Sequence, residues 1–350
     1  MESINTKKEL CIIYHFPCYD GAYGAINTYL YYNNFKRNKY NITFKPLRNI
    51  YPIFSAVDKK YDKIISLDLS LKDEDIPFLT NKENDATSIV IFDHHFSWYE
   101  KYIKEYKPKI SDRKKLKIIY DEKNTKSACG LSLNYYKSKC KVIKDVDEKE
   151  IESVFNKNLI SINNYIEDSD IGRFQIKDIH EFKSALSKDC PMHLSNFSFN
   201  YKKRIKRFLK INPLDMVQNG KQILMDLKKD CKKILNDNWI YIVELKDGIK
   251  FLMCITEKKY VRNYACPLLG KISKKRGFLP VGAFVYKYEK GKYKFSMRAS
   301  DDTCDVSKIA QLYGGGGHKS AAAFIMDYNG IDNLILSTID VYKDINDTPI

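Results

Sequence analysis

The sequence predicts an α/β protein with two domains, and three observations indicate this fold class. The chain has 350 residues, which is enough for two domains of ordinary size. In the N-terminal part, short apolar runs rich in β-branched residues are typical of buried strands in a mostly parallel sheet, and helical stretches follow several of them. From Trp239 onwards the pattern changes to closely spaced β-rich runs, which indicates a second, smaller α/β domain.

The predicted elements follow in order along the chain. Apolar, β-branched runs predict strands at residues 10–15, 41–47 (at an edge), 63–67, 88–92 and 115–120. Later runs predict strands at residues 239–244, 251–256, 281–288 and 293–298. Helices are expected at residues 21–33, from residue 127, over 151–166 and through most of 175–238. Gly291 predicts a hairpin turn between the last two strands.

Composition restricts the cellular context that we expect. Hydrophobic residues make up 44% of the chain, and no apolar run reaches the roughly 18 residues of a membrane span. The first ten residues lack the apolar core of a secretory leader. Nine cysteines are scattered without a CxxC pair, which is typical of reduced thiols. We therefore expect a cytoplasmic protein without a membrane partner.

The net charge of +16 has two interpretations. It could attract a phosphate-rich partner, since basic surfaces bind polyanions. It could also reflect nucleotide bias, because Lys far outnumbers Arg and because Asn, Ile and Tyr are abundant. The charge alone leaves both interpretations open.

Titratable side chains follow three of the predicted strands. The strand at 88–92 is followed by Asp93, His94 and His95, the strand at 63–67 by Asp68, and the first strand ends in His15 with Asp20 nearby. In an open parallel sheet, ligands bind at the carboxyl ends of the strands. Clustered carboxylates repel one another unless cations hold them together, so this pattern predicts a metal site.

Five motifs in order make the chain resemble the DHH phosphoesterases that carry a C-terminal DHHA1 domain. They are His15-Phe-Pro-Cys-Tyr-Asp-Gly21, Asp68, Asp93-His94-His95, Asp168-Ser-Asp-Ile-Gly-Arg-Phe174 and Gly314-Gly-Gly-Gly-His318. The resemblance implies a DHH catalytic domain at residues 1–200, a helical linker at 201–238 and a substrate-binding DHHA1 domain at 239–350. It also implies an active site in the cleft between the two domains.

The resemblance implies two divalent cations, with Mn²⁺ expected and Mg²⁺ or Co²⁺ as alternatives. One cation would take His15, Asp68 and, if it is a ligand, Cys18. The other would take Asp20, Asp68, His94 and either Asp170 or Asp168, with Asp170 preferred. Asp93 would orient a histidine, and His95 would face the substrate.

Cys18 departs from the family motif, which has an aspartate at this position. It could be a thiolate ligand that favours a softer metal, or a packed side chain without a metal. In the DHHA1 domain, the resemblance assigns the substrate grip to Arg298, Ser300, His318 and the glycines Gly314, Gly315, Gly316 and Gly317.

The function implied is metal-dependent hydrolysis of phosphoesters, by a phosphatase, phosphodiesterase or exonuclease. Short oligonucleotides or nucleoside bisphosphates are the expected substrates. An inorganic pyrophosphatase or polyphosphatase is one alternative, and a non-catalytic nucleic-acid-binding module with a degenerate metal site is another. The sequence leaves the oligomeric state open, including a homodimer.

Overall fold

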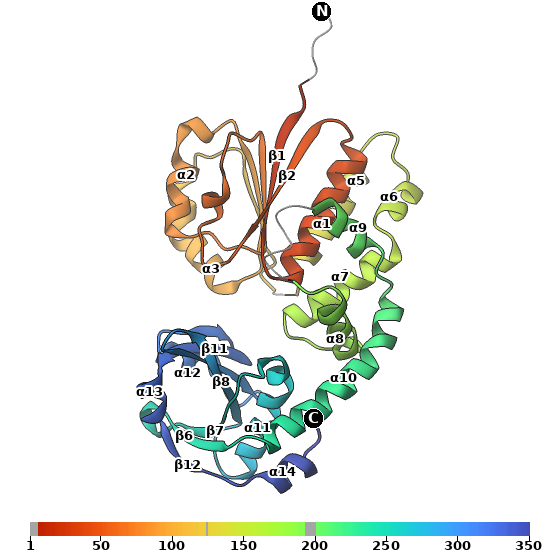
Figure 1. Ribbon diagram of the computed structural model, residues 1–350. Helices are drawn as coiled ribbons and strands as arrows, with labels where there is room; N and C mark the ends of the chain where they lie inside the picture. The colour runs from red at the N-terminus through yellow and green to blue at the C-terminus, as the bar shows by residue number, and fades with distance from the viewer. Residues whose placement is uncertain (1–5, 124, 193–200) are drawn as a thin grey trace, which may run out of the picture. The chain divides into compact units, whose positions relative to one another are not determined.

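The computed structural model describes residues 6–123, 125–192 and 201–350 (Figure 1). The chain divides into two compact units, residues 1–221 and 222–350. This division lies inside the segment 201–238 that the sequence analysis assigns to the linker, and it falls within one long helix, α10 (Pro213–Asn236). No helix in the described ranges is long and apolar enough to cross a membrane.

Unit 1 is built on a five-stranded sheet in which every strand pair is parallel. Its strand order is β2-β1-β3-β4-β5, so β2 lies at an edge as predicted. The bounds are β1 Lys8–His15, β2 Tyr40–Leu47, β3 Lys63–Leu67, β4 Ser88–Phe92 and β5 Leu116–Ile119. The predicted α/β class with a parallel sheet is therefore confirmed.

Helices cover both faces of this sheet, with α1 and α5 on one side and α2 and α3 on the other (Figure 1). The helices are α1 Tyr19–Phe35, α2 Ile76–Thr80, α3 Phe96–Lys101, α4 Lys107–Lys109, α5 Ala128–Cys140, α6 Glu148–Val154, α7 Lys157–Asp170, α8 Ile179–Asp189 and α9 Tyr201–Leu209. Short helical turns lie at Ile53–Ala56, Asp73–Asp75, Lys82–Asn84 and Tyr102–Tyr106. The single helix predicted at 151–166 is instead divided between α6 and α7.

A buried amide joins three of these helices. The side-chain nitrogen of Asn27 in α1 donates to Cys129 O and Ser132 Oγ in α5 and to Asn163 Oδ1 in α7, at 2.8–3.2 Å. Buried polar groups are stable only when they are paired in this way. The contacts fix α5 and α7 against α1, and these are the helices that contribute to the candidate site described below.

Unit 2 contains a seven-stranded sheet of order β10-β11-β9-β8-β7-β6-β12. Its strands are β6 Ile240–Glu244, β7 Lys250–Ile255, β8 Val281–Glu289, β9 Lys292–Ala299, β10 Gly316–His318, β11 Ala321–Asp327 and β12 Ile335–Thr338. Only β7 and β8 pair in parallel. The helices are α11 Arg262–Lys275, α12 Val306–Gln311, α13 Tyr328–Asp332 and α14 Tyr342–Asp347, with short turns at Lys246–Gly248 and Lys259–Val261.

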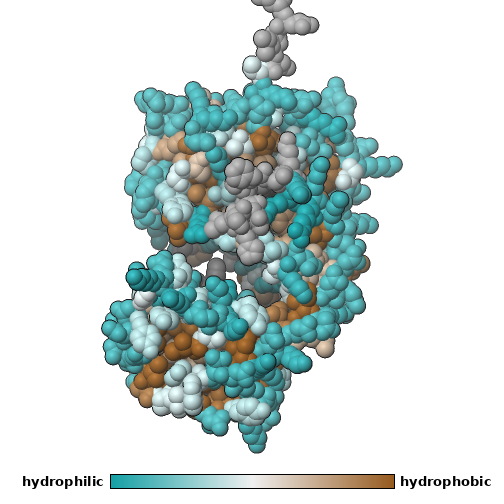
Figure 2. Space-filling model, in the orientation of Figure 1, coloured by the Kyte–Doolittle hydropathy of each residue, from teal (hydrophilic) through white to brown (hydrophobic). Residues whose placement is uncertain are grey.

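Two apolar clusters lie on opposite faces of this sheet. Phe295, Met297 and Phe324 belong to one cluster, and Phe284 packs with residues of α11 in the other. The sequence analysis predicted β6 to β9 but not the last three strands. Hydrophilic side chains cover most of the surface that Figure 2 shows on each unit.

Candidate metal centre

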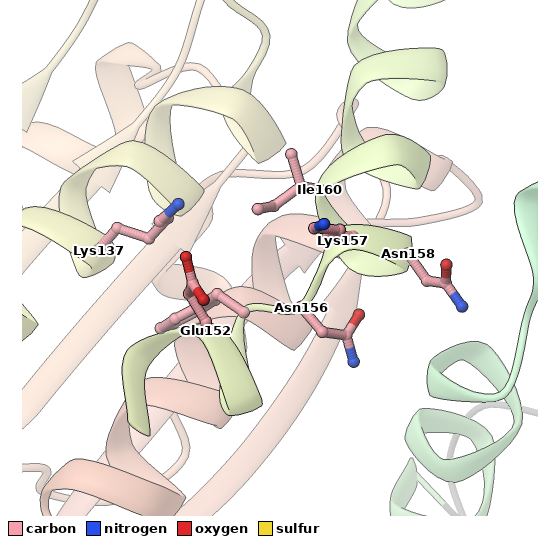
Figure 3. Close-up of a pocket in the computed structure, with 7 residues that line it drawn as sticks. Lys137, Glu152, Asn156, Lys157, Asn158 and Ile160 are labelled. Carbon is pink, nitrogen blue, oxygen red and sulfur yellow. The ribbon is translucent and has the colours of Figure 1, made fainter. Parts of the chain in front are cut away.

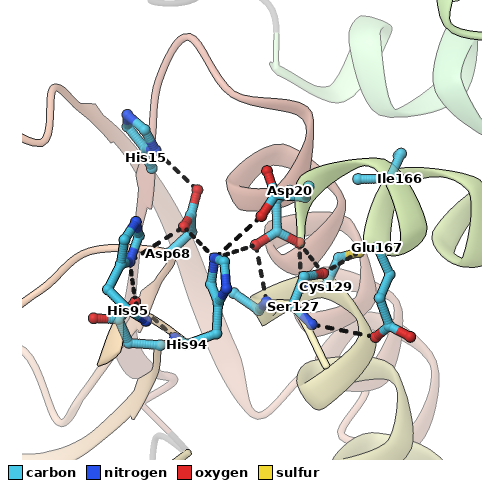
Figure 4. Close-up of polar contacts among 12 residues, drawn as sticks. His15, Asp20, Asp68, His94, His95, Ser127, Cys129, Ile166 and Glu167 are labelled. Carbon is cyan, nitrogen blue, oxygen red and sulfur yellow. Dashed lines mark hydrogen bonds and ion pairs between the residues drawn. The ribbon is translucent and has the colours of Figure 1, made fainter. Parts of the chain in front are cut away.

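The sheet of unit 1 brings three polar strand ends to the same level. Tyr14 of β1 is paired with Leu67 of β3, and Leu67 is paired with Phe92 of β4. The residues that follow these positions therefore emerge side by side, and Figure 4 shows His15, Asp68, His94 and His95 of this group. The full group is His15, Asp68, Asp93, His94 and His95.

Asp68 lies at the centre of the group. Its Oδ2 is 2.8 Å from His15 Nδ1, and its Oδ1 is 3.4 Å from His94 Nε2 and 3.9 Å from His95 Nδ1. Burial alone would raise the pKa of this carboxyl, but the contacts with His15 and His94 outweigh burial and hold the pKa well below its usual range. Its backbone has a positive φ of 58°, which is unusual for a residue other than glycine and is typical of functional sites.

His94 lies among three carboxylates. Its Nε2 is 3.1 Å from Asp170 Oδ2, 3.4 Å from Asp68 Oδ1 and 3.8 Å from Asp20 Oδ2. This nitrogen is buried and forms no hydrogen bond within the described part of the chain. Burial alone would lower the pKa of His94, but Asp170 and Asp68 raise it to about 11. An imidazole nitrogen facing several carboxylates has the chemistry of a divalent metal site.

Asp20 is fully buried at the start of α1 and is held by the first turn of α5. Its Oδ1 accepts hydrogen bonds from Ser127 Oγ at 2.5 Å and from Cys129 N at 2.8 Å, and its Oδ2 accepts one from Ala128 N at 2.8 Å (Figure 4). Asp20 thus satisfies amide groups that the start of a helix leaves without partners. Burial and the neighbouring carboxylates Asp170 and Asp68 raise the pKa of Asp20 to about 7.

Cys18 is half-buried and lies beside His15 and Asp68, so that Sγ, a ring nitrogen and a carboxylate oxygen are within 4.8 Å of one another. Burial, and then the carboxylates around it, raise the pKa of the Cys18 thiol well above its usual range. The thiol is therefore protonated at neutral pH unless a cation replaces the proton.

Three groups of side chains could each hold an ion, and two of them share Asp68. They are His15-Cys18-Asp68, Asp68-His94-His95 and Asp20-His94-Asp170. The buried His94 nitrogen and the carboxylates that face it have the chemistry of a divalent metal site. Seven side chains assigned to this site from sequence are brought together: His15, Cys18, Asp20, Asp68, His94, His95 and Asp170.

Asp93 does not contact the ligand nitrogen of His94 and instead orients His95. Its Oδ1 lies 2.7 Å from His95 Nδ1 and accepts the backbone N–H of His94, and its Oδ2 accepts a hydrogen bond from Ser70 Oγ at 2.8 Å. Burial alone would lower the pKa of His95, but Asp93 raises it to about 9. The His95 ring keeps 26% of its surface exposed, so it remains accessible to a substrate.

Asp168, kept as an alternative metal ligand, lies outside these groups. Its Oδ1 accepts a hydrogen bond from Arg173 Nε at 3.1 Å, and its Oδ2 accepts one from Ile176 N at 2.9 Å. The two residues Asp168 and Asp170 are about 200° apart around α7, because each residue turns a helix by about 100°. Of the two, Asp170 contacts His94, which agrees with the preference for Asp170, whereas Asp168 holds the turn after α7.

Several contributors to this site were not identified from the sequence as parts of it. Ser70 supports Asp93, and the amides of Ala128 and Cys129 support Asp20. Ser127 precedes α5, but its side chain makes no cap hydrogen bond to this helix and donates to Asp20. The partners of Asp20 are more than 100 positions away in the chain, so no local pattern could reveal them.

In unit 2, Arg298 lies on β9. Its guanidinium donates to Met297 O at 2.8 Å and to Asn263 Oδ1 at 3.0 Å, and it forms no ion pair with a carboxylate in the described ranges. Burial and the nearby Arg262 lower the pKa of Arg298. The Ser300 hydroxyl donates a hydrogen bond to Pro280 O at 3.2 Å, so its proton already has an acceptor within unit 2.

Two of the four glycines, Gly316 and Gly317, form part of an edge strand of the sheet of unit 2, and Gly314 and Gly315 precede that strand. Gly316 and Gly317 lie in β10 and pair with Ala323 and Ala322 of β11. A Cβ at Gly315 or Gly317 would collide with β11, whereas one at Gly316 would meet nothing within 4 Å. Gly314 and Gly317 also have positive φ values of 72° and 147°. Of His318, the backbone lies in β10, and the side chain is outside what the structure describes.

The described part of unit 1 contains a pocket at the clustered side chains and a second pocket away from them. One adjoins the metal centre and is lined by Cys18, Asp20 and Asp170 together with Tyr165, Phe182 and Lys183 among others. The other lies near α5, α6 and α7, with Lys137, Glu152, Asn156 and Lys157 in its lining, and contains none of the clustered side chains (Figure 3). The first pocket is therefore the one that places a bound molecule beside the clustered ligands.

Comparison with known proteins identifies part of the chain. Residues 249–343 match the DHHA1 domain, which confirms the resemblance for unit 2. No curated protein matches the sequence.

Three solved structures are similar to this chain. One is a pGpG-specific phosphodiesterase, PggH, from Vibrio cholerae, with 12% identity, coverage of 93% of this chain and 96% of that chain, and a TM-score of 0.45. Another is an exopolyphosphatase-related protein from Bacteroides fragilis, with 12% identity, coverage of 97% of this chain and 90% of that chain, and a TM-score of 0.38. The third is CDC45 from Entamoeba histolytica, with 10% identity, coverage of 97% of this chain and 94% of that chain, and a TM-score of 0.44.

Proposed function

Starting from a chain that carries a DHHA1 domain, we propose that this protein is a divalent-metal-dependent phosphoesterase. The observation that carries the proposal is the crowding of three carboxylates around one buried imidazole nitrogen, since Asp20, Asp68 and Asp170 all lie within 3.8 Å of His94 Nε2. Such an arrangement is costly without a cation.

Each side chain has a proposed role. His15, Asp68 and Cys18 would hold one cation, and Asp20, His94 and Asp170 would hold the other, with Asp68 shared. Bound cations of this kind lower the pKa of water and neutralise charge on phosphoryl oxygens. The mostly oxygen and imidazole ligands favour Mn²⁺, whereas a Cys18 thiolate would favour a softer ion at its position.

His95 would act on the substrate directly. Asp93 holds Nδ1 of the ring, which leaves Nε2 free to face the phosphoester. In the metal-free site, Asp93 raises the pKa of His95 to about 9, and the same contact would favour a proton on the ring during the reaction. The Nε2 proton could then be donated to the oxygen that leaves phosphorus, as general acids do.

The proposed substrate is a short oligonucleotide or a nucleoside bisphosphate. Arg298 supports this assignment because it is a half-buried cation without a carboxylate partner in the described part of the chain, and guanidinium groups bind phosphate strongly. The intact ligand groups around Asp68 argue against a degenerate site.

A substrate panel tests the proposal. The metal-free protein would be assayed with Mn²⁺ or with EDTA on a dinucleotide, a pentanucleotide, a nucleoside 3′,5′-bisphosphate, a cyclic dinucleotide and pyrophosphate. We expect hydrolysis of the first three with Mn²⁺, none with EDTA, and loss of activity in Asp68→Asn. Hydrolysis of pyrophosphate alone would contradict the proposed substrate class.

A further inference from the structure

The β9 strand of unit 2 presents two cations on one face. Phe295 and Met297 point into an apolar cluster of unit 2. Because side chains alternate along a strand, Lys294, Ser296 and Arg298 point to the opposite face. Lys294 and Arg298 are both half-buried and thus less hydrated than ordinary surface cations.

Two further cations lie close to this face, at the turn before α11. Nζ of Lys259 is 5.6 Å from the ring centre of Tyr286, and Tyr286 is the residue of β8 that pairs with Lys294. The Arg262 guanidinium donates to Lys259 O at 2.9 Å, which holds these two residues together. Asn263, the next residue, accepts the hydrogen bond from Arg298.

The four cations lack acidic partners. Within the described ranges, none of Lys259, Arg262, Lys294 and Arg298 forms an ion pair, whereas seven other lysines do. Burial and the other three cations lower the pKa of Lys294. Like charges gathered in this way are unfavourable in the free protein, and a bound polyanion would relieve the repulsion.

Exposed aromatic rings lie among these cations. Tyr260, between Lys259 and Arg262, is 52% exposed, and Tyr288 is 49% exposed with Lys294 Nζ 5.7 Å from its ring centre. Basic side chains interleaved with exposed aromatic rings are typical of surfaces that bind single-stranded nucleic acid, since the bases stack on the rings. Polyphosphate would use the cations but not the rings.

We propose that Lys259, Arg262 and Lys294 form a subsite for the backbone of a single-stranded oligonucleotide, next to the phosphate assigned to Arg298. This subsite deepens the proposed function and rests on it for the role of Arg298. It would add affinity for oligonucleotides of about three or more nucleotides without excluding a dinucleotide, because a dinucleotide has too few phosphates to occupy Arg298 and the three added cations together.

The test is a binding measurement in EDTA, so it does not depend on turnover. Fluorescence anisotropy would follow a labelled dinucleotide and a labelled pentanucleotide over a range of salt concentrations. The variants are Lys259→Gln and Arg262→Gln, and the matched control is Lys287→Gln, which removes a charge from the opposite face of β8. Melting temperatures would verify that all variants fold.

We expect each of the two variants to weaken pentanucleotide binding by roughly fivefold or more, with little change for the dinucleotide. Each should also reduce the slope of log binding constant against log salt concentration for the pentanucleotide by about 0.7–1. The control should match the wild type. Equal pentanucleotide affinity in the wild type and Arg262→Gln would overturn the subsite. Competition by inorganic polyphosphate as strong as that by oligonucleotide would overturn its assignment to nucleic acid. Absence of hydrolysis would count against the proposed function alone, since binding is measured without it.

Discussion

Replacing Ser127 by Ala tests how α5 prepares the metal centre without removing a proposed ligand. The Ser127 hydroxyl donates to Asp20 Oδ1 at 2.5 Å, and two backbone amides supply the other donors to this buried carboxylate. A hydrogen bond to a charged acceptor contributes about 1.5–3 kcal/mol. Its loss should favour the protonated form of Asp20, so that protons compete better with the cation.

The expected result is Mn²⁺ binding that is about 10–100-fold weaker, the range seen when a group supporting a metal ligand is lost. Calorimetric titration of the metal-free protein near pH 7.5 would measure it. Ser138→Ala is the control, because it removes a serine hydroxyl from the same helix that donates to Tyr135 O and not to Asp20. Unchanged Mn²⁺ affinity in Ser127→Ala, or an equal loss in both variants, would refute this reasoning.

Three other outcomes are expected. If Cys18 is a ligand, Cys18→Ser should lower metal occupancy, and Cys18→Asp should retain activity with a stronger preference for Mn²⁺. Equal metal occupancy in the wild type and Cys18→Ser, measured by elemental analysis, would show that Cys18 packs beside the site without binding metal. Gly316→Ala should leave the melting temperature unchanged or slightly higher, whereas Gly315→Ala should lower it, because only a Cβ at position 315 collides with β11. A stable Gly316→Ala protein with weakened substrate binding would mean that β10 contacts the substrate. In the metal-free protein, the pKa of Asp20 is raised to about 7, so the stability that this residue contributes is present below about pH 4 and lost as the pH rises through about 7. The melting temperature in EDTA should therefore fall between about pH 5 and pH 8 in the wild type and change less in Asp20→Asn, and an equal fall in both would contradict the assignment.

Much of unit 1 was predictable because its central strands are buried on both faces. Runs such as Ile64–Leu67 and Ile89–Phe92 are almost wholly apolar, and each is followed at once by a polar residue. Parallel pairing then brings those polar residues to one edge, so the sequence predicts the histidines and aspartates that meet there. The location of the metal centre thus follows from local patterns and one rule of sheet topology.

The contacts that tune the centre were not predictable, since they depend on helix orientation and distant partners. Asp168 and Asp170 look equivalent in sequence, but the rotation of α7 points only one of them at His94. In unit 2, β11 contains Ala321, Ala322 and Ala323, which favour helices. They form a strand because β10 and β9 pair with them on both sides, so tertiary contacts override local preference.

The most direct test of the central claim is the rate of dinucleotide hydrolysis by the metal-free protein as Mn²⁺ is added back. We expect no turnover in EDTA and a rise in rate that is complete when about two ions are bound per chain. The Asp68→Asn variant should stay inactive over the same range, because it loses the carboxylate shared by two ligand groups. Turnover in EDTA equal to that with Mn²⁺, or wild-type rates in Asp68→Asn, would contradict the account.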